Sequence, residues 1–101
     1  MRRGTTPAIV LTVDMDITSY TVYVTLKNRS AEITLTNDSV VMEYENGKTT
    51  LTFALTQEQT LKFGTGTCEV QVRAIHDGTA IATEIKTIDV NRILKEGVID
   101  E

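Results

Sequence analysis

Apolar and polar residues alternate in short stretches along almost the whole chain. An alternation with period two puts one set of side chains on a buried face and the other in solvent, so it is typical of β-strands. We expect seven strands, at residues 7–13, 20–27, 31–36, 40–44, 49–55, 67–75 and 80–90. Inward-facing side chains in the fourth strand are expected to be Val40, Met42 and Tyr44. The abundance of Thr and Val suits the same all-β fold class.

Two dipeptides between these stretches predict tight hairpins. Asn46 and Gly47 separate the fourth and fifth strands, and Asp77 and Gly78 separate the sixth and seventh. Both pairs favour a type I′ turn, because its two central residues need positive φ angles. The apolar pattern of the last strand also changes phase, which predicts a β-bulge near Lys86 and Thr87.

One short helix is expected at about residues 57–63, between the fifth and sixth strands. Thr56 and Gln59 have the spacing of a capping box, in which each side chain bonds the other's backbone N–H. Leu61 and Phe63 are the candidates for its buried side, and Gly64 is expected to end it in a left-handed conformation. A strand, a helical crossover and a long strand suggest, by analogy of fold, an immunoglobulin-like antiparallel sandwich.

The length and composition predict one domain with a terminal extension. Residues 1–91 form the expected sandwich, and 101 residues suffice for a core without disulfides. The net charge of −4 argues against a nucleic-acid partner, because a negative field repels phosphates. We also expect no membrane partner, since no apolar run is long enough to cross a bilayer. The single cysteine, Cys68, excludes an internal disulfide.

Residues 92–101 break the strand pattern and leave two interpretations open. They are either a loose tail or short strand extension, as chain ends usually are, or an arm that docks on a neighbouring subunit. The second interpretation rests on the four aliphatic residues of this segment. The candidate subunit-docking residues are Ile93, Leu94, Val98 and Ile99.

No group of residues predicts catalysis, a cofactor or a metal. His76 precedes the second hairpin turn, and Cys68 lies on the inward side of the same strand, too far away to form a pair with it. Asp14 and Asp16 suit a turn better than a calcium loop, since the Gly and distal Glu of an EF-hand are missing. We therefore expect a protein that is not an enzyme.

Three stretches resemble a known family: SYTVYVTLKN at residues 19–28, LTQEQTLKFGTGTCEVQVRAIHDG at residues 55–78, and the last strand at residues 80–90. Together they resemble the small immunoglobulin-like domain of siphophage and prophage tail proteins of Gram-positive hosts. The N-terminal domain of baseplate upper proteins is the most similar relative that we can name. No functional residue carries over individually.

This resemblance implies a non-enzymatic structural protein of a phage or prophage tail or baseplate. Its expected partners are other virion proteins and further copies of itself, and its expected location is the virion, or the host bacterial cytoplasm during assembly. Two alternatives remain open. One is a carbohydrate- or surface-binding sandwich module, which would need an exposed aromatic platform. The other is a small phage-encoded regulator that binds a host protein.

Overall fold

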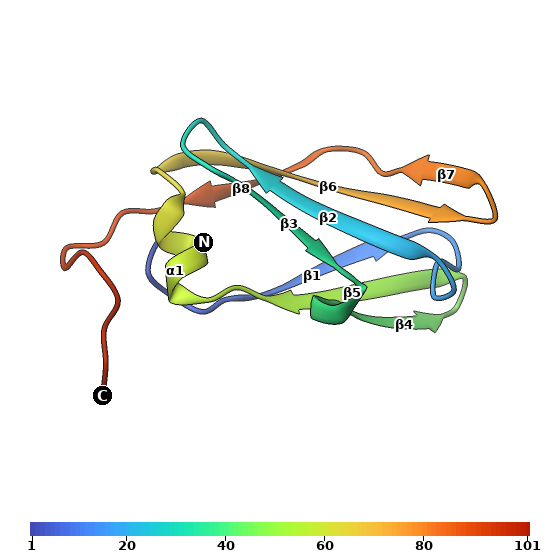
Figure 1. Cartoon of the computed structure of the whole chain (residues 1–101), viewed down its shortest axis with the longest axis horizontal. Coiled ribbons are helices and arrows are strands. Elements are labelled where there is room, and N and C mark those ends of the chain that lie inside the picture. The colour runs from blue at the N-terminus through green and yellow to red at the C-terminus, as the bar shows by residue number, and fades with distance from the viewer.

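The computed structural model describes all 101 residues and shows two antiparallel sheets packed face to face (Figure 1). The lower sheet in Figure 1 has the order β1–β5–β4, and the upper sheet has the order β3–β2–β6–β7, with β8 also pairing with β6. The strands are β1 (Ala8–Val13), β2 (Thr21–Lys27), β3 (Glu32–Thr36), β4 (Val41–Glu45), β5 (Lys48–Ala54), β6 (Gly66–His76), β7 (Thr79–Ala82) and β8 (Lys86–Val90). The expected all-β sandwich is confirmed.

The strand order is that of an immunoglobulin-like sandwich. The sheet β1–β5–β4 corresponds to strands B, E and D of that fold, and β3–β2–β6–β7/β8 corresponds to C′, C, F and G. The helix α1 (Gln57–Lys62) makes the crossover from β5 to β6, at one end of the sandwich (Figure 1). The predicted crossover at residues 57–63 is therefore confirmed.

Side chains of alternate residues from both sheets fill the space between the layers. In β2, for example, Val22, Val24 and Leu26 are fully buried while their neighbours face outwards. The core has 17 buried residues: Val13, Ile17, Val22, Val24, Leu26, Ile33, Leu35, Val40, Leu51, Phe53, Leu55, Phe63, Cys68, Val70, Val72, Ala74 and Val90. Tyr44 has the predicted inward parity, since it pairs with the buried Thr49, but it does not belong to this core. It lies half-exposed on the edge strand β4, two residues before the hairpin turn.

Both predicted hairpin turns are confirmed by the backbone. Asn46 and Gly47 have φ angles of 53° and 80°, and Asp77 and Gly78 have φ angles of 47° and 79°. These positive values are those of a type I′ turn, whose twist matches that of the flanking strands. The turns thus fix the registers of the β4–β5 and β6–β7 pairs, with Glu45 opposite Lys48 and His76 opposite Thr79.

The expected last strand is two strands separated by a bulge. Arg73 pairs with Ala82 and Val70 pairs with Lys86, so two residues of β6 face three residues of the other chain segment. The extra residue lies within 83–85, one to three residues before the predicted Lys86, and it moves the inward side from odd to even residues. The backbone N–H of Val72 donates to Thr83 Oγ1 at 3.1 Å, and that of Thr83 donates to the Val72 carbonyl at 2.9 Å. A side-chain hydroxyl therefore replaces a backbone acceptor at the break.

The capping box of α1 is confirmed, but its C-terminal end differs from the prediction. Thr56 Oγ1 accepts from the Gln59 N–H, and Gln59 Oε1 accepts from the Thr56 N–H. Gly64 is not left-handed; the positive φ belongs to Gly66, at 122°. Gly64 is needed for another reason, because a Cβ there would collide with Ser30 Oγ in the β2–β3 turn. The chain just after the helix therefore lies against that turn, and Asn28 of the turn donates to the Gly64 carbonyl.

Candidate interaction surfaces

The segment 92–101, here called the arm, leaves β8 and passes α1 without forming a helix or a strand (Figure 1). Three of its four aliphatic side chains are exposed: Leu94 by 90%, Val98 by 47% and Ile99 by 55%. The fourth, Ile93, is half-buried and packs beside Gly4, where an added Cβ would lie 3.0 Å from Ile93 Cδ1. Of the four predicted docking residues, Ile93 thus packs within the chain, and Leu94, Val98 and Ile99 face solvent.

The outer end of the arm is attached to the first residue of α1. The amide of Gln57 accepts from the Ile99 N–H at 2.9 Å and donates to the Ile99 carbonyl at 3.1 Å. Val98 lines a shallow hollow of about 450 Å³ between the arm, the start of α1 and the end of β5. The arm thus has a defined path beside α1, with Leu94 on its outer side.

Arg3 holds the middle of the arm against the end of the helix. Its Nε and one terminal nitrogen donate to the carbonyls of Phe63 and Leu61, at 2.7 and 2.9 Å. These carbonyls are the acceptors that a helix end leaves without a backbone partner. The other terminal nitrogen lies 2.6 Å from the carboxylate of Glu96 on the arm. One side chain therefore joins the N-terminal segment, α1 and the arm, and no motif in the sequence indicated this role.

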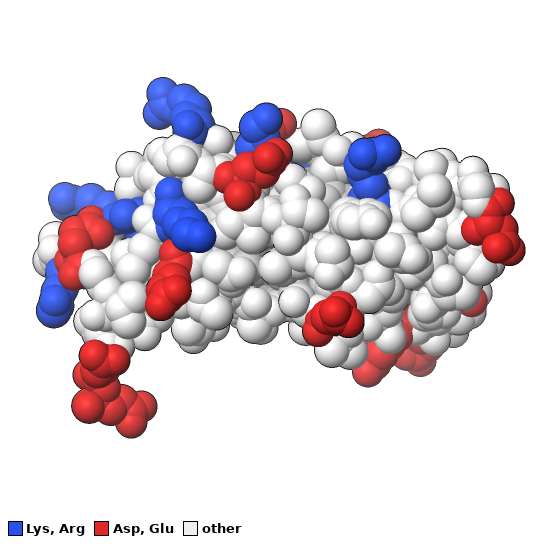
Figure 2. Space-filling model, viewed as in Figure 1, with Lys and Arg blue, Asp and Glu red and all other residues white.

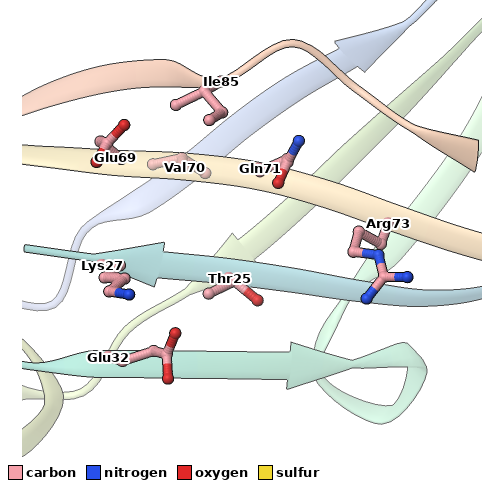
Figure 3. A pocket seen from close by; sticks show the side chains of 8 residues that line it. All are labelled: Thr25, Lys27, Glu32, Glu69, Val70, Gln71, Arg73 and Ile85. Carbon is pink, nitrogen blue, oxygen red and sulfur yellow. The ribbon is translucent and has the colours of Figure 1, made fainter.

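A second candidate surface is a hollow of about 310 Å³ on the outer face of the five-stranded sheet (Figure 3). Its side chains come from β2, β3, β6 and the bulge: Thr25, Lys27, Glu32, Glu69, Val70, Gln71, Arg73 and Ile85. Two cations and two carboxylates alternate around it, with Lys27 opposite Glu32 on one side and opposite Glu69 on the other. The charges of the two cations and two carboxylates sum to zero, so the hollow is polar without favouring either sign of charge.

Exposed aromatic side chains do not gather on one face. Tyr23 is half-exposed on the outer face of the five-stranded sheet, whereas Tyr44 is half-exposed on β4 of the other sheet. Tyr20 packs against the core, with its ring 5.2 Å from that of His76. A carbohydrate-binding platform usually needs neighbouring rings, so this arrangement gives the sheet face little support as such a site.

The charged groups are unevenly spread over the surface. On the face seen in Figure 2, the end with α1 and the termini carries both signs, and the lower edge of the opposite half is acidic. This acidic edge lies where Figure 1 shows β4, whose Glu43 and Glu45 are exposed. The arm and the β4 edge therefore offer different electrostatic surfaces.

The remaining residues singled out in the sequence have structural surroundings. Cys68 is fully buried, and burial raises the pKa of its thiol. His76 ends the same strand, with Nε2 3.4 Å from a carboxylate oxygen of Asp77. Asp16 accepts from the hydroxyl and the N–H of Thr18, and these bonds lower the pKa of its carboxyl, as the predicted turn requires.

No group of three or more His, Cys, Asp or Glu side chains is placed to hold a metal ion. None of the helices combines the length and the apolar character needed to span a membrane. Neither a scan against protein-family models nor a search of curated proteins found a match to this chain.

Proposed function

We propose that the protein is a non-enzymatic structural component of a phage or prophage tail or baseplate, which acts through protein–protein contacts. The phage assignment is supported by the resemblance of residues 19–28, 55–78 and 80–90 to tail-associated immunoglobulin-like domains. Its place of action is then the virion, or the host cytoplasm during assembly. Its partners are other tail proteins and further copies of itself.

The proposed role in protein–protein contacts is supported mainly by the exposed aliphatic side chains of the arm. Leu94 is 90% exposed, and Val98 and Ile99 are about half exposed, on a segment that Arg3 holds at Glu96 and Gln57 holds at Ile99. Ordering a free segment on binding costs conformational entropy. Because the arm already has a defined path, a neighbour that covers these aliphatic side chains gains apolar burial at a lower ordering cost.

The arm can be tested by its effect on assembly. In the prophage that encodes the protein, the double change Leu94→Ser and Val98→Ser replaces two exposed aliphatic side chains of the arm. The matched control is Val41→Ser, an exposed valine on β4. We expect the arm variant to be lost from purified particles and the control to be retained. Incorporation of the arm variant at the wild-type level would contradict the proposed role of the arm.

The two alternatives predict different results in the same preparations. A phage-encoded regulator would be present in the infected cell and absent from purified particles. A carbohydrate-binding module would be retained after the arm change, and it would lose glycan binding after Tyr23→Ala on the sheet face. The separation of Tyr23 and Tyr44 on different sheets is the reason that this alternative is the weaker one.

A further inference from the structure

Each sheet has outer strands with one unpaired edge, and these edges differ in their protection. An unpaired edge offers backbone N–H and C=O groups to another chain, and proteins usually protect it with charges, bulges or short strands. The β4 edge carries Glu43 and Glu45, and β3 carries Glu32. The strand β7 has only four residues and is followed by the bulge, and the residue after β8, Asn91, forms a parallel bridge with Arg2.

The strand β1 has none of these protections. Its sequence, AIVLTV, contains no charge, and its six residues pair with β5 without a bulge. In the immunoglobulin-like order the outer neighbour of β1 would be one further strand, and no strand of this chain takes that place. The β1 edge is therefore the one most open to an added strand.

The hydrogen-bonding groups of this edge can be identified from the ladder. The Leu55 N–H donates to the Pro7 carbonyl, so the odd residues of β1 bond to β5. Because bonding direction alternates along an antiparallel strand, the N–H and C=O groups of Ala8, Val10 and Thr12 point away from the sheet. Pro7 is an odd residue, so the N–H that a proline lacks would have pointed towards β5. The proline therefore does not disrupt hydrogen bonding at the free edge.

Next to this edge lies a partly apolar groove between the two sheets. A hollow of about 510 Å³ separates the end of β1 from β7 and the bulge, and its lining includes Val13, Met15 and Ile81. Ile9 and Leu11 on the inner face of β1 are only half-buried although they pack against the core. A strand added to β1 would cover these side chains from the open side.

We propose that β1 pairs with β1 of a second copy of this chain, antiparallel about a two-fold axis, to form a continuous six-stranded sheet. In this register Val10 faces Val10 of the second copy, and Ala8 faces Thr12 of the second copy. The free backbone N–H and C=O groups of Ala8, Val10 and Thr12 in each copy then bond to those of the other copy, which gives about six N–H···O bonds between the copies. The contact is isologous, as expected for a two-fold dimer.

The distribution of charged residues favours a second copy of the chain as the partner strand, and β1 as the edge that it pairs with. Pairing β1 with itself brings no charged side chain opposite another within the strand. Pairing β4 with itself along its whole length would be centred on Glu43 and would set that carboxylate opposite its own copy. Like charges directly opposite each other destabilise a strand pair. Of these two edges of the sheet, β1 is the self-complementary one.

The sheet supplies a matched pair of variants for the test. Val10 and Val41 both face Thr52 of β5, one from each side, and they are 59% and 62% exposed. The substitutions Val10→Lys and Val41→Lys therefore place the same charge in the same row and on the same face, but on opposite edges. Only Val10→Lys puts two like charges together in the proposed dimer.

Sedimentation equilibrium of the full chain, from about 10 μM to about 1 mM, measures the association. We expect wild type and Val41→Lys to dimerise with similar affinity. For Val10→Lys we expect the dissociation constant of the dimer to rise by roughly tenfold or more. A chain that ends at Asn91 should dimerise like wild type, because the arm is not part of this contact. A monomeric wild type, equal dimerisation of both lysine variants, or loss of the dimer on removal of the arm would each overturn the proposal.

Amide exchange gives a second measurement that does not depend on how the variants fold. In the wild-type protein, exchange at Val10 and Thr12 should slow as the concentration rises, because their N–H groups become bonded to the second copy. Exchange at Met42 and Tyr44, on the edge of β4, should not change with concentration. Equal behaviour of the two edges would contradict pairing through β1.

Discussion

The side-chain amide of Gln57 binds both backbone groups of Ile99, as a residue of a neighbouring strand would. The two residues are 42 positions apart, and Gln57 is at the same time the first residue of α1. The helix that carries the chain between the sheets thus also fixes the outer end of the arm. The arm is thus fixed at two points, Glu96 on Arg3 and Ile99 on Gln57; Val98 is half-exposed between them, and Leu94 is exposed just before the first.

Gln57→Ala should release the outer end of the arm without unfolding the sandwich. The change removes the acceptor of the Ile99 N–H and the donor to the Ile99 carbonyl, while the capping box of Thr56 and Gln59 remains. We expect the Ile99 amide to exchange about as fast as in an unstructured peptide. Hydrogen exchange followed by NMR measures this, with Glu58→Ala as the control. Unchanged protection of Ile99 would show that Gln57 does not hold the arm.

Arg3→Met should lower the free energy of unfolding by about 1–3 kcal/mol, because the carbonyls of Leu61 and Phe63 lose a charged donor. Glu96→Gln removes only the ion pair with Arg3. Because the carboxylate of Glu96 is well exposed, we expect the free energy of unfolding to change by no more than about 0.5 kcal/mol. Urea unfolding of both variants separates the two contributions. If Glu96→Gln costs as much as Arg3→Met, the ion pair and not the helix end is the main contact.

Thr83→Val should destabilise the fold by about 1–2 kcal/mol, since the Val72 N–H loses its hydroxyl acceptor while the side-chain shape is kept. Thr87→Val, on the exposed side of β8, serves as the control and should change the stability by less than about 0.5 kcal/mol. Thermal unfolding measures both. Equal stability of the two variants would mean that the bulge is held by the backbone alone.

Stability should fall in mildly alkaline solution because of Cys68. Burial raises the pKa of this thiol above its ordinary value of 9.0, so the folded protein keeps a proton that the unfolded chain releases. The unfolded state then gains stability as the pH rises through the thiol's unperturbed pKa, and the contribution is fully present only below it. Between about pH 8 and about pH 10, urea unfolding of wild type should weaken more steeply than that of Cys68→Ala. Parallel slopes would contradict this.

Local patterns in the sequence were sufficient for most of the fold. The alternation in residues 20–27 and 67–75 predicts β2 and β6, and the turn residues Asn46, Gly47, Asp77 and Gly78 predict the two hairpins. The spacing of Thr56 and Gln59 predicts the start of α1. Each of these features depends on residues close together in the chain, so the local rules apply to them directly.

Contacts between distant residues could not be predicted in this way. Ile17 lies in a turn by its sequence, yet it is fully buried, because Thr49 Oγ1 accepts its N–H and donates to the Met15 carbonyl. Gly64 resembles a helix terminator but is required by the approach of Ser30. In the candidate site, the composition of residues 92–101 indicated apolar docking residues. That Ile93 packs within the chain depends on Gly4, which lies at the other end of the sequence.

The most direct test of the central claim compares the arm in free protein and in assembled particles. Hydroxyl-radical footprinting with mass spectrometry measures the reactivity of Leu94 and Val98 in both samples, with the exposed Val41 as an internal reference. We predict that the protein is found in purified tail particles and that Leu94 and Val98 become several-fold less reactive there. Absence of the protein from the particles, or equal reactivity of Leu94 in both samples, would contradict a structural role that depends on contacts of the arm.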